Sequence, residues 1–149
     1  MAQTTTAASA RAATVWLDSS AGGSLANISG STTSIEPDFG LEIAEYRVFQ
    51  DRWAHQLDGG RSASITLNVV YSTTASEGWA ILRDWWLATN PGARTLDWYA
   101  PDATAGSDHF SCEVRIESLR HTLAAGDGGP VIVTARLVPD GTISRTVVT

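Results

Sequence analysis

The chain has 149 residues, enough for one compact domain and too few for two, so we predict a single domain. Its net charge of −6 argues against a protein that grips nucleic acid by neutralising phosphates. All ten basic residues are arginine, which excludes a phosphate-binding lysine of the P-loop type and a lysine Schiff base. The only cysteine is Cys112, so an intrachain disulfide and a cysteine-clustered zinc site are also excluded.

The first residues differ in composition from the rest of the chain. Residues 1–12 hold few large apolar side chains, which predicts a flexible N-terminal arm, and residues 13–149 then form the single domain. No stretch approaches the roughly 20 apolar residues that span a bilayer, and none near the start resembles a signal peptide. We therefore expect a cytoplasmic, soluble chain without a membrane contact.

A hairpin is predicted at the start of the domain. ATVWL and SLANIS are short β-type runs, and the DSSAGG between them supplies turn residues. LEIAEYRVFQ, residues 41–50, is rich in β-branched and aromatic residues and predicts a strand. The next segment, residues 50–61, is expected to be a polar loop that closes on a turn at Asp58-Gly59-Gly60.

Strict alternation marks SASITLNVVY, residues 62–71, as a strand with one buried face. The face expected in the core consists of Ala63, Ile65, Leu67, Val69 and Tyr71.

One helix is predicted over residues 73–92. Thr74 and Glu77 have the spacing of a capping box, and Asn90-Pro91-Gly92 ends the segment. The spacing of Trp79, Leu82 and Trp86 indicates that these side chains face the sheet. Six tryptophans are many for this length, and we expect Trp53 and one of Trp85 and Trp86 to lie outside the core as anchors for protein contacts.

The rest of the chain predicts further strands. RTLDWYAP gives a strand, residues 101–109 a loop, and FSCEVRIESLRHTL a long alternating strand. PVIVTARLVP and GTISRTVV then read as a final hairpin around Pro139-Asp140-Gly141. Antiparallel strands with one helix predict a mainly β fold, an antiparallel β-sandwich or open barrel with one flanking α-helix.

The sequence offers little catalytic chemistry. His55, His109 and His121 lack metal-ligand spacing, so we predict no metal site and no cofactor. A small hydrolase that uses His109 with Asp108 or another acid is left as a weak alternative. Glu113 and Glu117 could form a glycosidase pair, although an exposed strand face with Arg115 between them explains them more simply.

The order of these features resembles the major tail tube protein of long-tailed, non-contractile bacteriophages. The resemblance rests on VWLDSSAGGSLANIS, TTSIEPD, LDGGRSASITLNVVYSTT and the WAILRDWW helix. That family is related to the tube proteins of contractile tails and of type VI secretion.

The resemblance implies the tail-tube fold and a non-enzymatic structural protein of the virion tail, made in the cytoplasm of the host bacterium. Subunits of the family form hexameric rings that stack into a tube for DNA ejection. The implied partners are other copies of the chain, the tape measure, terminator and distal tail proteins, and DNA that passes without specific binding. A tail terminator or a distal tail ring protein of the same fold remains an alternative.

The implied assembly gives two groups of candidate residues. The side chains expected to line the lumen are Ser64, Thr66, Asn68, Glu113, Arg115 and Glu117. The side chains expected at contacts between subunits are Arg52, Trp53, His55, Asp102, Asp108 and His109. A carbohydrate-binding β-sandwich that uses Trp53, Trp98 and Tyr99 is the alternative from another class.

Overall fold

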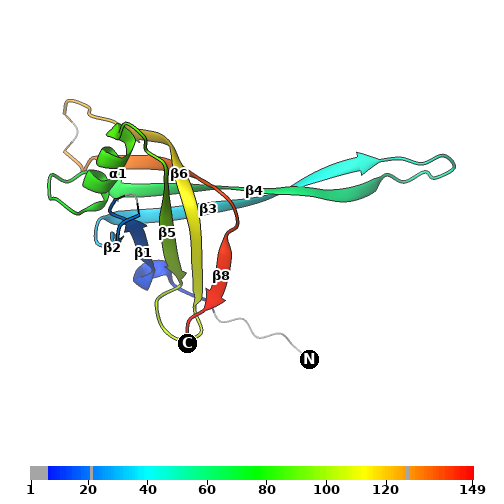
Figure 1. Ribbon diagram of the computed structural model, residues 1–149, viewed down its shortest axis with the longest axis horizontal. Helices are drawn as coiled ribbons and strands as arrows, with labels where there is room; N and C mark the ends of the chain where they lie inside the picture. The colour runs from blue at the N-terminus through cyan, green and yellow to red at the C-terminus, as the bar shows by residue number, and fades with distance from the viewer. Residues whose placement is uncertain (1–6, 21, 127) are drawn as a thin grey trace.

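A computed structural model describes residues 7–20, 22–126 and 128–149. Its described part contains eight strands in one antiparallel sheet, one α-helix and a short 3₁₀ turn (Figure 1). The elements are the 3₁₀ turn Ala10–Ala12, β1 Thr14–Asp18, β2 Leu25–Asn27, β3 Thr32–Tyr46, β4 His55–Val70, α1 Gly78–Leu87, β5 Ala93–Ala100, β6 Asp108–His121, β7 Ile132–Pro139 and β8 Ser144–Val147.

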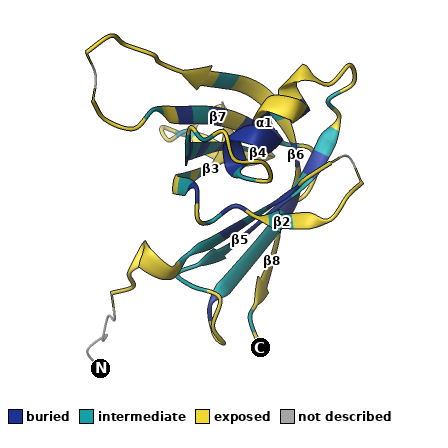
Figure 2. Cartoon of the chain, turned by 90° about the vertical axis from the view of Figure 1, so that its left-hand side faces the viewer, coloured by how far each residue is buried: buried dark blue, intermediate teal, exposed yellow. Residues whose placement is uncertain are grey.

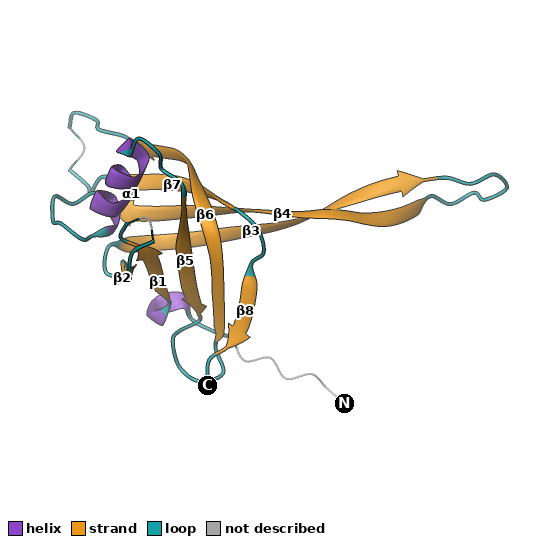
Figure 3. Ribbon diagram, in the orientation of Figure 1, coloured by secondary structure: helices purple, strands orange, loops and turns teal. Residues whose placement is uncertain are grey.

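The sheet folds over on itself at β6. The first part of β6 pairs with β5 and β8, its last part pairs with β7, and a register shift separates Ile116 from Ser118. As a result β1, β5, β6 and β8 cross β3, β4 and β7 at a steep angle (Figure 3). The strand order β2-β1-β5-β6-β7-β4-β3 leaves the sheet open, in agreement with the predicted mainly β fold with one flanking helix.

The core lies between the two halves of this folded sheet. Ile65, Leu67 and Val69 of β4 are fully buried, as the alternation predicts, although Ala63 is half-buried and Tyr71 is exposed. β7 adds Val133, Ala135 and Leu137, which are also fully buried. Since burying a large apolar side chain contributes roughly 1.5–3 kcal/mol, this alternation on paired strands fixes which face of the sheet is inside.

The start of α1 is set by a contact with another strand. The helix covers only Gly78–Leu87, and Glu77 makes no side-chain cap, so the predicted capping box with Thr74 is wrong. The Gly78 N–H instead donates to the Ser31 hydroxyl at 3.0 Å. A Cβ on Gly78 would approach Val69 Cγ1 to 2.9 Å, so glycine lets the helix begin close against β4.

The buried face of α1 differs by one residue from the prediction. Trp79, Leu82 and Trp85 are buried, whereas Trp86 is 52% exposed, so the prediction that Trp86 faces the core is wrong. Figure 2 shows α1 with one side buried and another exposed. The tryptophan expected outside the core is therefore Trp86.

The predicted loop at residues 50–61 is mostly strand. β4 begins at His55, and the connection between β3 and β4 spans only residues 47–54. Asp58 pairs with Ile43, and the register shift between Leu41 and Ile43 accommodates the extra glycine of Gly59-Gly60 as a bulge. The glycines that predicted a turn at this point bend a long strand instead.

Strand pairing at the two ends of the chain follows the sequence only in part. β1 and β2 form the predicted N-terminal hairpin, with Trp16 opposite Asn27. The predicted final hairpin of β7 with β8 is wrong. Instead β8 pairs with β6, which places Val147 opposite Asp108. Of the predicted flexible arm, residues 1–6 lie outside the described residues, and residues 10–12 form the 3₁₀ turn.

Candidate assembly surfaces

The most unusual surface is a long hairpin that leaves the body of the domain. We define residues 39–63 of β3 and β4 with their connection as the hairpin extension, which projects far from the other strands (Figure 1). Its exposed large apolar side chains are Phe39, Leu41, Ile43, Tyr46, Val48, Phe49, Trp53 and Leu57. An isolated two-stranded hairpin is marginal in water, and apolar patches of this kind mark sites of protein contact.

The two faces of the hairpin extension differ in polarity. The register places Ile35 opposite Leu67 in the core, and the same face continues outward as Phe39, Leu41 and Ile43. We call these three side chains the apolar stripe; each is about half exposed. The core face of the sheet thus runs out of the domain without a covering layer. Glu42 lies on the opposite face of the strand.

A groove lies at the foot of the apolar stripe, where the extension meets the body. It has a volume of about 570 Å³, and its apolar walls include Phe39, Ala63, Phe110 and Ile143. The rings of Phe39 and Phe110 are 6.2 Å apart. The groove therefore extends the uncovered apolar surface from the stripe to the body of the domain.

Three predicted contact residues, Arg52, Trp53 and His55, meet at the tip of the hairpin extension. Trp53 is 80% exposed. The His55 ring is 2.6 Å from an Asp51 carboxylate oxygen and stacks on Tyr46 with 5.2 Å between centroids. The backbone N–H of Trp53 and the His55 side chain lower the pKa of Asp51 by hydrogen bonding to its carboxylate. The tip is thus ordered by its own contacts while the indole of Trp53 remains in water.

The other three predicted contact residues lie at a different end of the domain. The Asp102 carboxylate accepts hydrogen bonds from the Ser107 and Thr104 hydroxyls at 2.6 Å each, which lower the pKa of Asp102. Asp108 accepts a hydrogen bond from Arg145 Nε at 2.7 Å. Asp102 lies in the connection between β5 and β6, whereas Asp108 and His109 are the first two residues of β6, so the predicted loop 101–109 is two residues too long. The start of β6 lies near the C-terminus in Figure 1, away from the hairpin extension.

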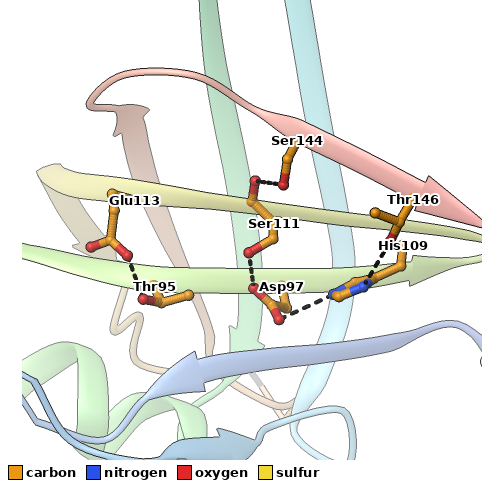
Figure 4. A network of polar contacts seen from close by, with 7 residues as sticks. All are labelled: Thr95, Asp97, His109, Ser111, Glu113, Ser144 and Thr146. Atoms are coloured by element: carbon orange, nitrogen blue, oxygen red, sulfur yellow. Dashed lines mark hydrogen bonds and ion pairs between the residues drawn. The ribbon is translucent and has the colours of Figure 1, made fainter.

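A polar cluster surrounds His109 (Figure 4). Asp97, which is 8% exposed, accepts a hydrogen bond from Ser111 at 2.6 Å and contacts His109 Nε2 at 3.1 Å. The other ring nitrogen of His109 faces the Thr146 hydroxyl at 3.3 Å. Ser111 therefore bonds to the carboxylate and not to the imidazole, so this arrangement does not activate it as a nucleophile.

The alternative hydrolase is expected to use His109 with Asp108 or another acid. Asp108 bonds to Arg145, so the acid in contact with His109 is Asp97. Asp97 was not among the predicted site residues. Its contacts depend on the pairing of its strand with the strand of Ser111, which no local sequence pattern shows.

Four of the candidate lumen residues share the polar face opposite the core. Asn68 accepts a hydrogen bond from Thr134 at 2.6 Å and donates one to Ser34 at 2.8 Å. Ser64 and Glu117 line one shallow groove, although they come from β4 and β6. Thr66 lies between Ser64 and Asn68 in the same alternation. This face is polar, and Asn68 hydrogen-bonds to side chains of the two neighbouring strands.

The remaining candidates, Glu113 and Arg115, lie on the N-terminal side of the bend in β6. The Glu113 carboxylate accepts a hydrogen bond from the Thr95 hydroxyl (Figure 4), and Arg115 Nε is 2.9 Å from Asp140. They share the strand face of Glu117, which pairs with Arg136 at 2.7 Å. Because β6 bends after Ile116, Glu113 belongs to the half of the sheet that contains β5.

The aromatic residues of the carbohydrate alternative do not form one platform. Trp98 is buried at 3% exposure and stacks on Phe110 at 5.1 Å. Trp53 lies at the tip of the hairpin extension, and Tyr99 stacks on His109 at 4.3 Å. A sugar ring could not contact the three together.

We expect the Cys112 thiol to be unreactive in the folded protein. It is 5% exposed, and burial raises the pKa of its thiol to about 11. Because the thiolate is the reactive form, we expect no labelling by a maleimide at pH 7.5 in the native state and full labelling in denaturant. Rapid native labelling would show that the β5–β6 region opens.

Comparison with known proteins relates the fold to phage tails. No family model and no curated protein matches the chain. A solved gene transfer agent tail with C6 symmetry matches with a TM-score of 0.67 at 19% identity, covering 89% of this chain and 94% of that chain. The SPP1 tail tube matches with a TM-score of 0.69 at 13% identity, covering 91% and 77%.

The anti-feeding prophage cap, which terminates its tube, matches with a TM-score of 0.73 at 13% identity, covering 99% and 95%. The chain therefore has the fold found in phage tail tubes and in the tubes of contractile injection systems. These similar proteins are structural components of tails.

Among the described residues, no helix is long and apolar enough to cross a membrane. No group of three His, Cys, Asp or Glu side chains in this part of the chain could hold a metal ion.

Proposed function

We propose that this chain is a structural protein of a phage-type virion tail, forming hexameric rings that stack into a tube through which DNA leaves. The observation that carries the proposal is the hairpin extension, whose exposed apolar side chains a monomer leaves in water. The similar gene transfer agent tail has C6 symmetry, which supports six copies per ring.

The polar face suits the lumen of such a tube. Ser64, Thr66 and Asn68 present hydroxyl and amide groups, and Arg115 and Arg136 are paired with acids. Arg120, opposite Thr134, is the arginine of this face that makes no ion pair among the described residues. A wall with little unpaired cationic surface gives a phosphate backbone few places to bind. In this arrangement Glu113, Arg115 and Glu117 also face the channel, and DNA passes without specific recognition.

The tip of the hairpin extension, and the β5–β6 connection with the start of β6, supply the contacts between subunits. Arg52, Trp53 and His55 reach a neighbour at one end, and Asp102, Asp108 and His109 at the other. In the virion, the first and last rings contact the tape measure, terminator and distal tail proteins, and the chain is made in the host cytoplasm. It performs no catalysis and binds no cofactor.

A tube-terminating ring is the second candidate. The anti-feeding prophage cap has the same fold and aligns over nearly the whole chain, so the fold serves both positions. The two functions differ in one property: a tube protein stacks its rings, whereas a terminator forms a ring that stops.

Electron microscopy of the concentrated protein, together with its mass in solution, tests the proposal. We expect rings of six copies and hollow tubes built from them. Single rings that never stack would favour the terminator. A protein that remains monomeric at millimolar concentration would overturn self-assembly by this chain.

The lumen assignment predicts a change in DNA binding. Glu113→Arg with Glu117→Arg should leave ring formation intact, because both side chains are exposed, yet make assembled tubes retain duplex DNA at low salt. Retention should fall steeply with added salt and should be measured by co-sedimentation. Glu113→Gln with Glu117→Gln is the matched control, since it removes both acids without adding cations. Tubes of the arginine variant that bind no DNA would place these residues elsewhere.

A further inference from the structure

We propose that the outer side of α1 of one copy packs lengthwise on the apolar stripe of the next copy, so that α1 lies between its own sheet and its neighbour's hairpin extension. The inference rests on the proposed self-assembly and names the two surfaces that meet. Both surfaces are uncovered in the single chain, and they lie toward opposite ends of its long axis (Figure 1).

The outer side of α1 is apolar where a helix in water would be polar. Trp86 is 52% and Leu87 66% exposed, although the opposite side of the same helix fills the core. They border a hollow of about 270 Å³ whose other walls are Trp79, Arg83, Leu119 and His121. We call this surface the α1 outer patch.

The two surfaces match in length and relief. The apolar stripe runs over four residue steps, roughly 14 Å of strand, and the part of α1 that borders the outer patch, Trp79 to Leu87, makes about 12 Å of helix. The groove at the foot of the stripe has a volume of about 570 Å³, which is more than a large ring such as that of Trp86 occupies. In turn, the hollow of the α1 outer patch can receive the Ile43 side chain.

The charges beside the two surfaces are complementary. Arg61 lies opposite Leu41 on the face of the stripe, and Asp58 lies opposite Ile43, so the charge changes from positive to negative toward the tip. Among the described residues Arg61 makes no ion pair. In one orientation of α1, Asp84 faces Arg61 and Arg83 faces Asp58.

The ion pair between Arg83 and Asp84 within one copy does not prevent these two side chains from pairing with the neighbouring copy instead. Their side chains are 44% and 65% exposed and 3.0 Å apart, and exposed pairs contribute about 0–1 kcal/mol. The two contacting surfaces are different, and in the assembly that we propose they meet head to tail. Each copy then offers one unused surface until a ring closes, whereas a reciprocal two-fold pair would stop at two copies and give covalent dimers only in the cysteine test below.

Paired cysteines test the contact directly, since Cys112 is buried and its thiol is largely protonated. In the variant with Leu41→Cys and Leu87→Cys, oxidation should join successive copies into a ladder of covalent multimers on a non-reducing gel. Either single variant can form at most dimers. The matched control, Glu42→Cys with Leu87→Cys, moves the first thiol to the opposite face of the hairpin extension and should yield no ladder.

The outcomes separate this inference from the proposed function. Rings or tubes with no ladder, or an equal ladder from the Glu42→Cys control, would overturn the α1 contact while leaving self-assembly standing. A failure of the unmodified chain to assemble at all would overturn both.

A charge exchange gives a second test that requires no cysteine. Arg61→Asp and Asp84→Arg should each raise the protein concentration at which half the copies assemble by roughly two- to fivefold, the effect of one exposed pair. Combining them should restore the original concentration. Both positions are exposed, but Asp84 also interacts electrostatically with the buried Arg94, so thermal unfolding must verify that each variant is folded before assembly is compared. Additive losses in the double variant would contradict the pairing.

Discussion

Replacing Leu41 and Ile43 by aspartate should abolish assembly while leaving the monomer folded. Both side chains are about half exposed in the single chain, at 44% and 57%, so the monomer loses little apolar burial. In an assembly that covers them, two carboxylates would enter an apolar interface, each at a cost of several kcal/mol. We expect the assembly concentration to rise at least 100-fold, equivalent to about 2.7 kcal/mol.

Sedimentation velocity over a range of concentrations measures this effect, and circular dichroism with thermal unfolding verifies the monomer. Leu123→Asp is the matched control, because Leu123 is 71% exposed on the connection between β6 and β7, away from the hairpin extension. Assembly of the double variant at the concentration of the unmodified protein would show that the apolar stripe stays in water. The hairpin extension would then need another explanation than subunit contact.

The alternation of single strands could be predicted from the sequence, whereas the neighbours of each strand could not. Ile65, Leu67 and Val69 are buried because a period of two on a half-covered strand allows no other face. The pairing of β8 with β6 depends on where a chain of four residues finds a free edge, which a local pattern does not encode. The short segment after Gly141 therefore resembled half of a hairpin with β7.

The limits of local patterns are clearest in the hairpin extension. The sequence around Asp58-Gly59-Gly60 has the composition of a turn, yet these residues lie within β4 as a bulge. On β3 the alternation continues beyond the body, but β4 places Arg61 and Asp58 on the face of the apolar stripe, so this part of β4 has the composition of a loop. The predicted contact residue Trp53 does lie at an exposed tip, but the sequence could not show that a long strand pair carries it there.

The start of α1 shows the same dependence on a distant partner. Thr74 and Glu77 have the spacing of a cap, but the helix begins where the Gly78 N–H meets the Ser31 hydroxyl. For a helix of ten residues, packing contributes more than local propensity. The same packing decides which of two adjacent tryptophans is buried, since either could have faced the sheet within the error of the predicted boundary.

These adjacent tryptophans give the second large effect, and they divide folding from assembly. Trp85 is fully buried; its indole N–H donates to the Pro91 and Gly92 carbonyls at 3.0 and 3.2 Å, and the Arg94 guanidinium lies 5.1 Å from its ring centre. Trp85→Ala should lower the free energy of unfolding by about 3–5 kcal/mol, because it leaves a large cavity between α1 and the sheet. For a chain of this size the midpoint of thermal unfolding should fall by roughly 10 °C or more.

Trp86→Ala is the matched variant at the next position, and its effects should be the reverse. Because the Trp86 side chain is half exposed, the free energy of unfolding should change by less than about 1 kcal/mol. If the α1 outer patch is a contact surface, however, losing a buried interface tryptophan should raise the assembly concentration about tenfold or more. Calorimetry and sedimentation on the two variants resolve the assignment. Equal losses of stability would mean that both rings stabilise the fold, whereas unchanged assembly of a folded Trp86→Ala protein would mean that α1 faces solvent in the tube.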